Sequence, residues 1–232
     1  MLQLALASSS LSQALPPKCN PPVAFQADLL IFDPNRRRAC GGPWGSGGNK
    51  SCEFRGNGKY AYDSVSQSVR IHQETFRPIE NSTAEATNDI LELWEANPPR
   101  VYLRTEANEG AVSCVYENID TSKGAKFPKF EVPTKAKFTG IEVIGSVPDA
   151  VELNVYQWST TSATDEVENY MRFTARGCIP VTSYRFSNLT GFHYEEYSNV
   201  ELGSEPSHFK PPLGCKPVPP GTITGYGGVK YN

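Results

Sequence analysis

Cys178 is the residue whose role decides what chemistry this chain could perform. It lies in the stretch ARGCIPVTSYRFSN, residues 175–188, between a glycine and Ile-Pro-Val, with alternating side chains on both sides. A cysteine placed like this is a catalytic nucleophile, a metal ligand or one half of a disulfide bond. A nucleophile needs a base beside it and a lowered pKa. His193 is the only histidine nearby in sequence, and the surrounding residues have the pattern of an ordinary strand. The disulfide is therefore favoured.

The other residue types that often perform catalysis do not form a catalytic or metal-binding pattern. No cysteine falls in a Cys-x-x-Cys pair or in a zinc-spaced Cys/His cluster, and the three histidines are scattered. The chain lacks a Gly-x-Ser-x-Gly turn, a His-Glu-x-x-His motif and an EF-hand loop. Glu195 and Glu196 are adjacent, but neighbouring side chains of a strand point to opposite faces. We therefore expect no catalytic residue and no enzyme, and no metal ligand can be assigned.

The glycine-rich stretch CGGPWGSGGNKSC has some features of a phosphate-binding loop. The spacing of that motif is not met, because Asn49 separates the last glycine from Lys50. A disulfide bond between Cys40 and Cys52 explains the stretch better, since it would close a surface loop that carries a glycosylation sequon. We predict this bond and assign the loop no nucleotide.

Cysteines and sequons together indicate where the protein resides. The six cysteines are Cys19, Cys40, Cys52, Cys114, Cys178 and Cys215. An even number of dispersed cysteines is typical of an oxidising compartment. Three Asn-x-Ser/Thr sequons, at Asn49, Asn81 and Asn188, are acceptors for N-linked glycans. These features predict a secreted, extracellular glycoprotein.

The two ends of the chain differ in composition from the middle. Residues 1–14, MLQLALASSSLSQA, are interpreted as an atypical or truncated signal peptide, because they are apolar and end in small residues but lack a basic start. Residues 219–232 are rich in proline and glycine and are expected to be flexible. Residues 15–218 form the predicted domain. No later stretch is apolar enough to span a bilayer, and a net charge of -3 argues against nucleic-acid binding.

The pattern of apolar residues predicts strands throughout the domain. In AFQADLLIF, for example, Phe25, Ala27, Leu29 and Ile31 share one face. About nine or ten such segments, separated by turn residues, predict an all-β antiparallel sandwich or barrel with little α-helix. Residues 90–96, ILELWEA, fit a helix as well as a strand, and we favour a strand that pairs with VYLRTEA across two prolines.

Six stretches, taken in order, match the pattern of a known family. They are PKCNPPVAFQADLLIFDP, GKYAYDSVSQSVRIHQE, FEVPTKAKFTGIEVIGS, YQW, RFTARGCIPVTSYRF and EPSHFKPPLGC. The chain thereby resembles the ependymin family of secreted glycoproteins over residues 17–218. The Gly-Cys-x-Pro-Val and Phe-x-Pro-Pro-x-x-Cys pieces are the most specific. The insert that holds Cys40 and Cys52, and the tail after Cys215, depart from the family pattern.

The resemblance implies a disulfide pairing, which spacing alone leaves open because six cysteines allow many pairings. The implied bonds are Cys19–Cys178, Cys114–Cys215 and, for the two cysteines of the insert, Cys40–Cys52. In this arrangement Gly177 lets the chain bend at a strand end and Pro180 restricts its exit. Cys178 then ties the last third of the domain to its first strand.

The resemblance also implies a fold and a function. The fold is two stacked, curved antiparallel sheets around a hydrophobic pocket, similar to bacterial lipoprotein carriers, and often a dimer. Aromatic residues of the strands are candidates for the pocket wall, although aromatics at such positions are more often packed core. These candidates are Trp94, Tyr156, Trp158, Tyr170 and Phe173.

Two functions follow as hypotheses. The first is a non-enzymatic extracellular protein that binds a hydrophobic or lipid-like molecule in the sheet cavity. The second is a cell-matrix adhesion glycoprotein that acts through calcium and glycans, without a pocket ligand. The resemblance implies calcium and no other cofactor, and the two functions are compatible.

Overall fold

The computed structural model describes most of the chain. The described residues are 19–36, 52–76, 84–107, 110–146, 148–161, 165–187 and 191–223, without the side chains of 34–36, 52–54, 75–76, 84–85 and 123. The predicted signal peptide, the predicted Cys40–Cys52 bond and the three sequon asparagines lie outside this part.

Strands dominate the described residues, as the period-two pattern predicts. They are β1 (Ala24–Arg36), β2 (Cys52–Asp63), β3 (Ser68–Phe76), β4 (Ala84–Leu93), β5 (Arg100–Ala107), β6 (Val112–Asn118), β7 (Lys137–Ile144), β8 (Val151–Thr161), β9 (Glu166–Thr174), β10 (Pro180–Ser187), β11 (Gly191–Leu202) and β12 (Lys216–Pro217). Two 3-10 turns, η1 (Thr121–Lys123) and η2 (Pro206–Phe209), are the only helical elements of the described part. None of its helices could therefore cross a membrane.

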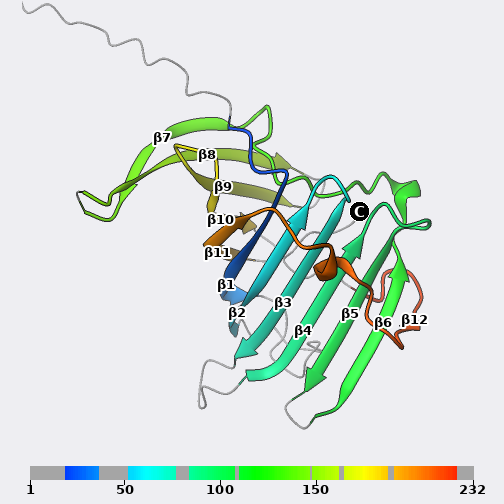
Figure 1. Ribbon diagram of the computed structural model, residues 1–232. Helices are drawn as coiled ribbons and strands as arrows, with labels where there is room; N and C mark the ends of the chain where they lie inside the picture. The colour runs from blue at the N-terminus through cyan, green and yellow to red at the C-terminus, as the bar shows by residue number, and fades with distance from the viewer. Residues whose placement is uncertain are drawn as a thin grey trace, which may run out of the picture.

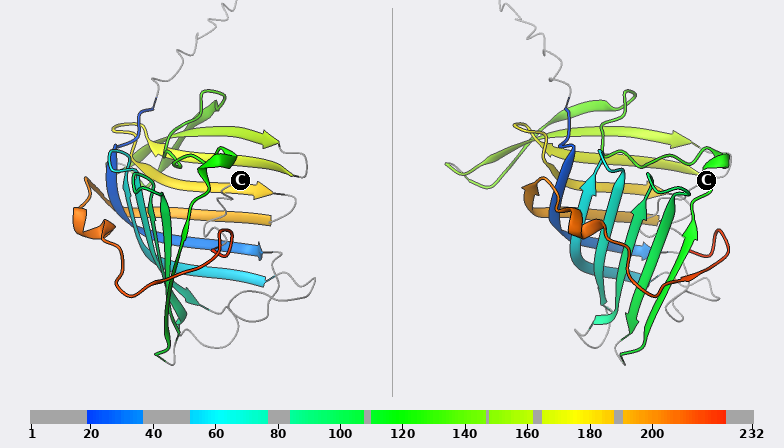
Figure 2. Two further views of the ribbon diagram at one scale, coloured as in Figure 1. Left: turned by 90° about the vertical axis from the view of Figure 1, so that its right-hand side faces the viewer. Right: turned by 45° about the vertical axis from the view of Figure 1, so that its right-hand side comes forward.

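All twelve strands belong to one continuous sheet, which corrects the expectation of two stacked sheets. The strand order is β12-β6-β5-β4-β3-β2-β1-β11-β10-β9-β8-β7. Neighbouring strands are antiparallel except β12 and β6, which are parallel. The two expected layers are joined because β1 pairs with β2 along one edge and with β11 along the other. The sheet bends, so that β7–β11 and β3–β6 run at an angle around a concave face (Figures 1 and 2).

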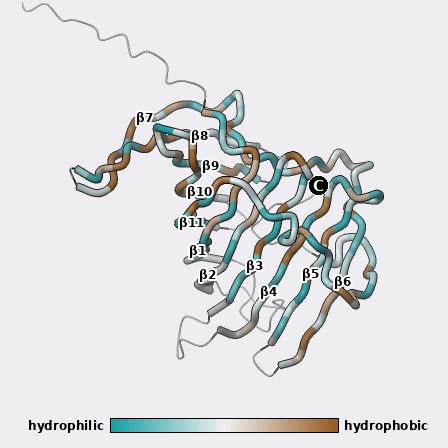
Figure 3. Tube along the Cα trace, in the orientation of Figure 1, coloured by the Kyte–Doolittle hydropathy of each residue, from teal (hydrophilic) through white to brown (hydrophobic). Residues whose placement is uncertain are grey.

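Alternation within each strand decides which side chains face inward. Phe25, Ala27, Leu29 and Ile31 of β1 are all at most 5% exposed, as predicted. Figure 3 shows the same alternation of apolar and polar residues along neighbouring strands. The inner face carries the hydrophobic core, because burying apolar area is the main favourable contribution to folding.

The ambiguous segment at residues 90–96 is a strand as far as Leu93. Ile90 lies opposite Leu103, and Leu93 lies opposite Arg100, so β4 and β5 form the predicted hairpin across the prolines. Propensity alone could not separate helix from strand here, and the pairing with β5 decides it.

The structure contains the two long-range disulfide bonds that the family resemblance implies. Cys19 is bonded to Cys178, and Cys114 to Cys215. The chain turns just before β10, where Gly177 has φ 82° and Cys178 itself has φ 51°. A left-handed backbone of this kind is what glycine readily adopts. Cys178 therefore links the start of β10 to the residues just before β1.

The first residues of the predicted flexible tail are packed against the sheet. Ile223 is 7% exposed and belongs to a buried cluster with Trp94 and Ile90. The backbone N–H groups of Thr222 and Ile223 donate to Glu117 Oε2 at 2.8 and 3.0 Å. Tail residues after 223 lie outside the described part.

A connecting segment crosses the inner face of the sheet. Residues 125–136, which we call the strap, run between η1 and β7. Phe127 stacks on Tyr62 with ring centroids 5.5 Å apart, and Phe130 meets Phe25 edge-to-face at 5.3 Å. The strap thus covers part of the surface that the sheet would otherwise leave open.

Candidate functional site

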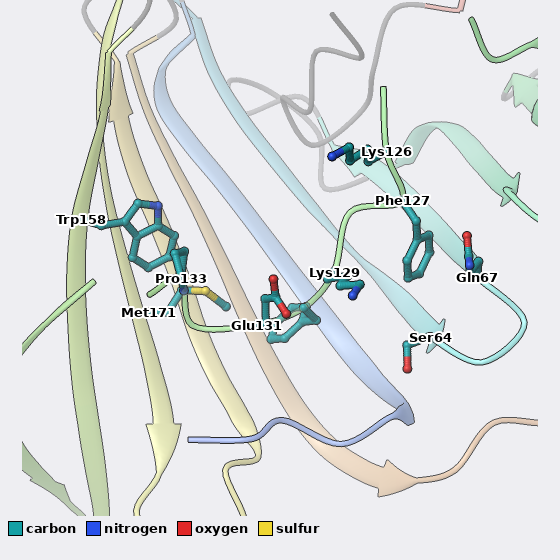
Figure 4. Close-up of a pocket in the computed structure, with 10 residues that line it drawn as sticks. Ser64, Gln67, Lys126, Phe127, Lys129, Glu131, Pro133, Trp158 and Met171 are labelled. Atoms are coloured by element: carbon teal, nitrogen blue, oxygen red, sulfur yellow. The ribbon is translucent and has the colours of Figure 1, made fainter. Parts of the chain in front are cut away.

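A cavity of about 620 Å³ lies between the strap and the inner face of the sheet (Figure 4). Its lining residues are Ser64, Gln67, Lys126, Phe127, Lys129, Phe130, Glu131, Pro133, Trp158 and Met171. Pockets of this size are typical of sites for small molecules. The cavity is therefore the candidate functional site.

The strap supplies more than half of the lining residues. Its sequence KFPKF, residues 126–130, alternates charged and aromatic side chains around Pro128. Phe127 and Phe130 are half-buried against the sheet, whereas Lys126 and Lys129 are exposed. Figure 4 shows Trp158 and Met171 on one side of the cavity and Lys126 and Phe127 on the other. The site thus has an apolar interior and a cationic rim.

Strands β8 and β9 position the other apolar wall. Met171 lies directly opposite Tyr156 in the register of these strands, and Trp158 lies two residues further along β8. Since side chains two apart on a strand point to the same face, Tyr156 and Trp158 both face inward. Trp158 is thus brought to the cavity.

The predicted wall residues have different places in the structure. Trp158 lines the cavity. Tyr156 and Phe173 are packed in the buried cluster beside it, at 6% and 0% exposure. Trp94 lies behind the strap, with its ring centroid 6.4 Å from that of Phe127.

The prediction that Tyr170 lines the pocket is wrong. Tyr170 lies on the outer face of the sheet, where its ring is stacked on Tyr184 at 4.6 Å. Residues 170 and 171 are neighbours on a strand, so only one of them can point inward. That residue is Met171, which is 8% exposed and lines the cavity.

The residues of the strap were missed because the segment forms no strand and has no periodic pattern. A signal was present all the same. Phe127 and Phe130 are large apolar residues in a segment with two prolines. Because such residues are usually buried in folded proteins, they indicate that the segment packs against another surface.

A buried charged cluster occupies another part of the inner face. His193 lies between two carboxylates, with Nδ1 2.5 Å from Asp33 Oδ1 and Nε2 3.0 Å from Glu195 Oε1. Tyr197 Oη donates to Glu195 Oε2 at 2.7 Å. The side chains of His193, Asp33 and Glu195 are only 12%, 10% and 18% exposed. His193, Glu195 and Tyr197 alternate along β11 and so share one face, which could have been recognised from the sequence.

This cluster keeps His193 charged at neutral pH. Burial alone would lower its pKa, but the hydrogen bonds and charges of Asp33 and Glu195 outweigh burial and raise the pKa to about 9. Burial likewise acts to raise the pKa of Glu195, and His193 and Tyr197 outweigh it, so that this pKa is lowered. A protonated histidine cannot act as a general base, and the arrangement supports an ion network that joins β1 to β11.

Glu92 is a buried carboxyl group on the same face with one hydrogen-bond donor near it. Trp94 Nε1 donates to its Oε2 at 3.0 Å. Burial raises the pKa of Glu92 to about 7, against the opposing effect of this hydrogen bond. Between about pH 4.5 and 7, Glu92 is therefore mostly protonated in the folded state and mostly ionised in the unfolded state.

We expect Glu92→Gln to stabilise the protein at pH 8 and to leave it nearly unchanged at pH 4. A raised pKa means that ionisation of Glu92 costs folding free energy, so the wild type loses stability as the pH rises from about 4.5 to 7. The gain at pH 8 is about 2–3 kcal/mol, because glutamine keeps an acceptor for Trp94 without the charge. Urea unfolding at both pH values measures it. A gain of the same size at pH 4 would contradict this explanation.

The described residues do not form a recognisable metal centre. No group of three or more His, Cys, Asp or Glu side chains within that part of the chain could hold a metal ion. The residues available at the cavity are two lysines, one glutamate and neutral groups, which favour an organic ligand over a cation.

Comparison with known proteins finds a family resemblance in the second half of the described sheet. No curated protein matches the chain significantly. The family model for ependymin matches residues 103–215. The matched segment begins within β5 and ends at Cys215. It includes the strap, the strands β8 and β9 that form the apolar wall of the cavity, and three of the four cysteines in the two disulfide bonds. Over this segment the chain is similar to the ependymin family.

Proposed function

We propose that this protein is a secreted, non-enzymatic carrier that holds a lipid-like molecule with an anionic end in the cavity under the strap. The observation that carries the proposal is the cavity itself, about 620 Å³ in volume, with apolar walls and two lysines at its rim. The two long-range disulfide bonds support an extracellular location, since such bonds persist in oxidising compartments.

The apolar walls favour a hydrocarbon chain. Phe127, Phe130, Pro133, Trp158 and Met171 present aromatic, aliphatic and thioether surface to the cavity. Each methylene group buried against such surface contributes about 0.8 kcal/mol. A chain of several methylenes is thus bound firmly without any polar contact, which makes an apolar ligand the best fit.

The rim favours a negative charge on the ligand. Lys126 and Lys129 lie on the strap, and within the described residues neither ammonium group forms a hydrogen bond or an ion pair. Glu131 is also at the cavity, so the rim has a net charge of one positive unit. A carboxylate, phosphate or sulfate group at the end of the chain would be attracted there.

A matched pair of probes tests both parts of the proposal. A fluorescent long-chain fatty acid and its methyl ester differ only in charge. We expect the wild type to bind both probes. The double variant Lys126→Ser, Lys129→Ser should bind the acid about tenfold more weakly and the ester unchanged, because each exposed ion pair contributes up to about 1 kcal/mol.

The control variant is Lys59→Ser. Lys59 is 73% exposed and forms its ion pair with Asp28, on the outer face of the sheet. This variant should bind both probes as the wild type does. Failure of the wild type to bind either probe would overturn the proposed function. Equal weakening of acid and ester would overturn the anionic end alone.

Calcium binding and contact with the extracellular matrix remain a second proposal. They rest on the family resemblance, the three sequons and the net charge of -3. A homodimer is also proposed, from the family resemblance alone. Calorimetric titration with calcium before and after removal of N-glycans separates a protein site from a glycan effect. Binding that disappears with the glycans supports the adhesive role.

A further inference from the structure

Phe130 of the strap lies at the centre of an aromatic cluster on the inner face. Its ring contacts rings from four strands, with centroid separations of 5.3 to 6.4 Å. The partners are Phe25, Tyr60, Tyr62, Phe173 and Tyr197. All five contacts are edge-to-face, at interplanar angles of 60° to 89°, a favourable geometry for aromatic pairs.

The same ring forms part of the cavity wall. Phe130 lines the cavity and is half-buried, whereas Phe25 and Phe173 beneath it are 0% exposed. The ring therefore separates the cavity from a further apolar surface that belongs to the sheet. If the ring moved away, that surface would extend the cavity.

The strap is joined to the sheet by few polar contacts. Its backbone makes no hydrogen bond to the backbone of any described strand, and its two internal bonds are Glu131 N–H to Lys129 O and Ala136 N–H to Pro133 O. One N–H, that of Phe130, donates to Tyr62 Oη at 3.0 Å. Lys135 Nζ donates to Ser159 O at 2.8 Å, on an exposed part of the strap. Displacing Phe130 thus breaks side-chain packing and a single backbone hydrogen bond.

We propose that Phe130 determines the length of the apolar chain that the cavity accepts, and that longer chains bind by displacing its ring from the aromatic cluster. This inference rests on the proposed function. Phe130 is a specificity-determining residue in this view. A short chain occupies the cavity beside the ring, while a long chain takes the place of the ring against Phe25, Phe173 and Tyr197.

The energetics give the expected pattern in affinity. Each methylene group that enters apolar surface strengthens binding about fourfold. Burial of a phenylalanine side chain is equivalent to roughly two to four methylene groups. The affinity of the wild type for fatty acids should therefore rise with chain length up to the length at which the chain reaches the ring. It should then stay level over roughly two to four further methylenes, whose burial offsets displacement of the ring, and rise again for longer chains. Without the ring the level section disappears.

Saturated fatty acids of 8 to 18 carbons, measured by displacement of a fluorescent fatty acid, test this pattern. We expect Phe130→Ala to remove the level section and to bind the longest chains roughly 10- to 100-fold more tightly than the wild type does, with the shortest chains unchanged. Phe130→Leu should lie between the two. The control is Phe186→Ala, at an outer-face position where Phe186 is 48% exposed, and it should match the wild type.

A second measurement needs no variant, in case Phe130→Ala does not fold. Hydrogen exchange of the Phe130 amide, whose partner is Tyr62 Oη, should accelerate when an 18-carbon acid binds and stay unchanged with an 8-carbon acid. An identical length dependence in the wild type and Phe130→Leu, together with unchanged exchange, overturns this inference and leaves the proposed function intact. Absence of fatty-acid binding by the wild type overturns both.

Discussion

Replacing Cys19 and Cys178 together by serine is expected to lower the free energy of unfolding by about 5 kcal/mol. The bond joins residues 159 apart in sequence, and closing so long a loop removes much of the conformational entropy of the unfolded chain. The net stability of a typical domain is about 5–15 kcal/mol. We therefore expect the double variant to be largely unfolded at body temperature. Chemical denaturation and thermal melting, followed by circular dichroism, measure the change.

The second disulfide bond serves as the comparison for the first. Cys114 and Cys215 are 101 residues apart, and the entropic effect depends only on the logarithm of this number. Replacing this pair by serine should therefore have nearly the same effect as replacing the first. If adding reductant to the wild type leaves its melting temperature unchanged, the bonds do not stabilise the fold and this explanation is wrong.

Replacing His193 by glutamine is expected to destabilise the protein by about 3–5 kcal/mol at pH 7, because it leaves the carboxylates of Asp33 and Glu195 buried without their shared cation. A pKa raised to about 9 means that the contribution of His193 is complete below its unfolded pKa of 6.5 and is lost as the pH rises through 9. The difference between variant and wild type should thus be largest at pH 6 and smaller at pH 10. Urea unfolding at these pH values measures it.

His72→Gln is the matched control for this experiment. His72 is a half-buried histidine of β3, and it belongs to no buried ion cluster among the described residues. This variant should differ little from the wild type at either pH. A destabilisation by His193→Gln that stays constant from pH 6 to 10 would show that the imidazolium charge is not what holds the cluster together.

The sequence predicts best the features that depend on neighbouring residues. Alternation in β1 identifies its inner face because the period of a strand is two, and the structure confirms each of the four apolar positions. The strand at residues 90–93 follows from the same alternation together with its hairpin partner. The two long-range disulfide bonds could be assigned only through the family resemblance, because spacing does not distinguish among the pairings.

The features that sequence analysis missed depend on residues that are distant along the chain. A single sheet results because β1 accepts β11 on its second edge, and no local pattern predicts that pairing. Alternation along β9 showed that Tyr170 and Met171 point to opposite faces but not which face is concave. The strap was missed for a similar reason, since Phe127 and Phe130 acquire a role only when the sheet provides a surface beneath them.

The central place of β1 also has a consequence for biogenesis. Among the described strands β1 is synthesised first, and its second edge stays without a partner until β11 (Gly191–Leu202) has been made. During that time the nascent chain presents an apolar strand with a free edge, which is prone to aggregate. Pairings between distant segments also form slowly. Production of this protein should therefore depend on chaperones that shield the hairpin of β1 and β2 until β11 has been synthesised.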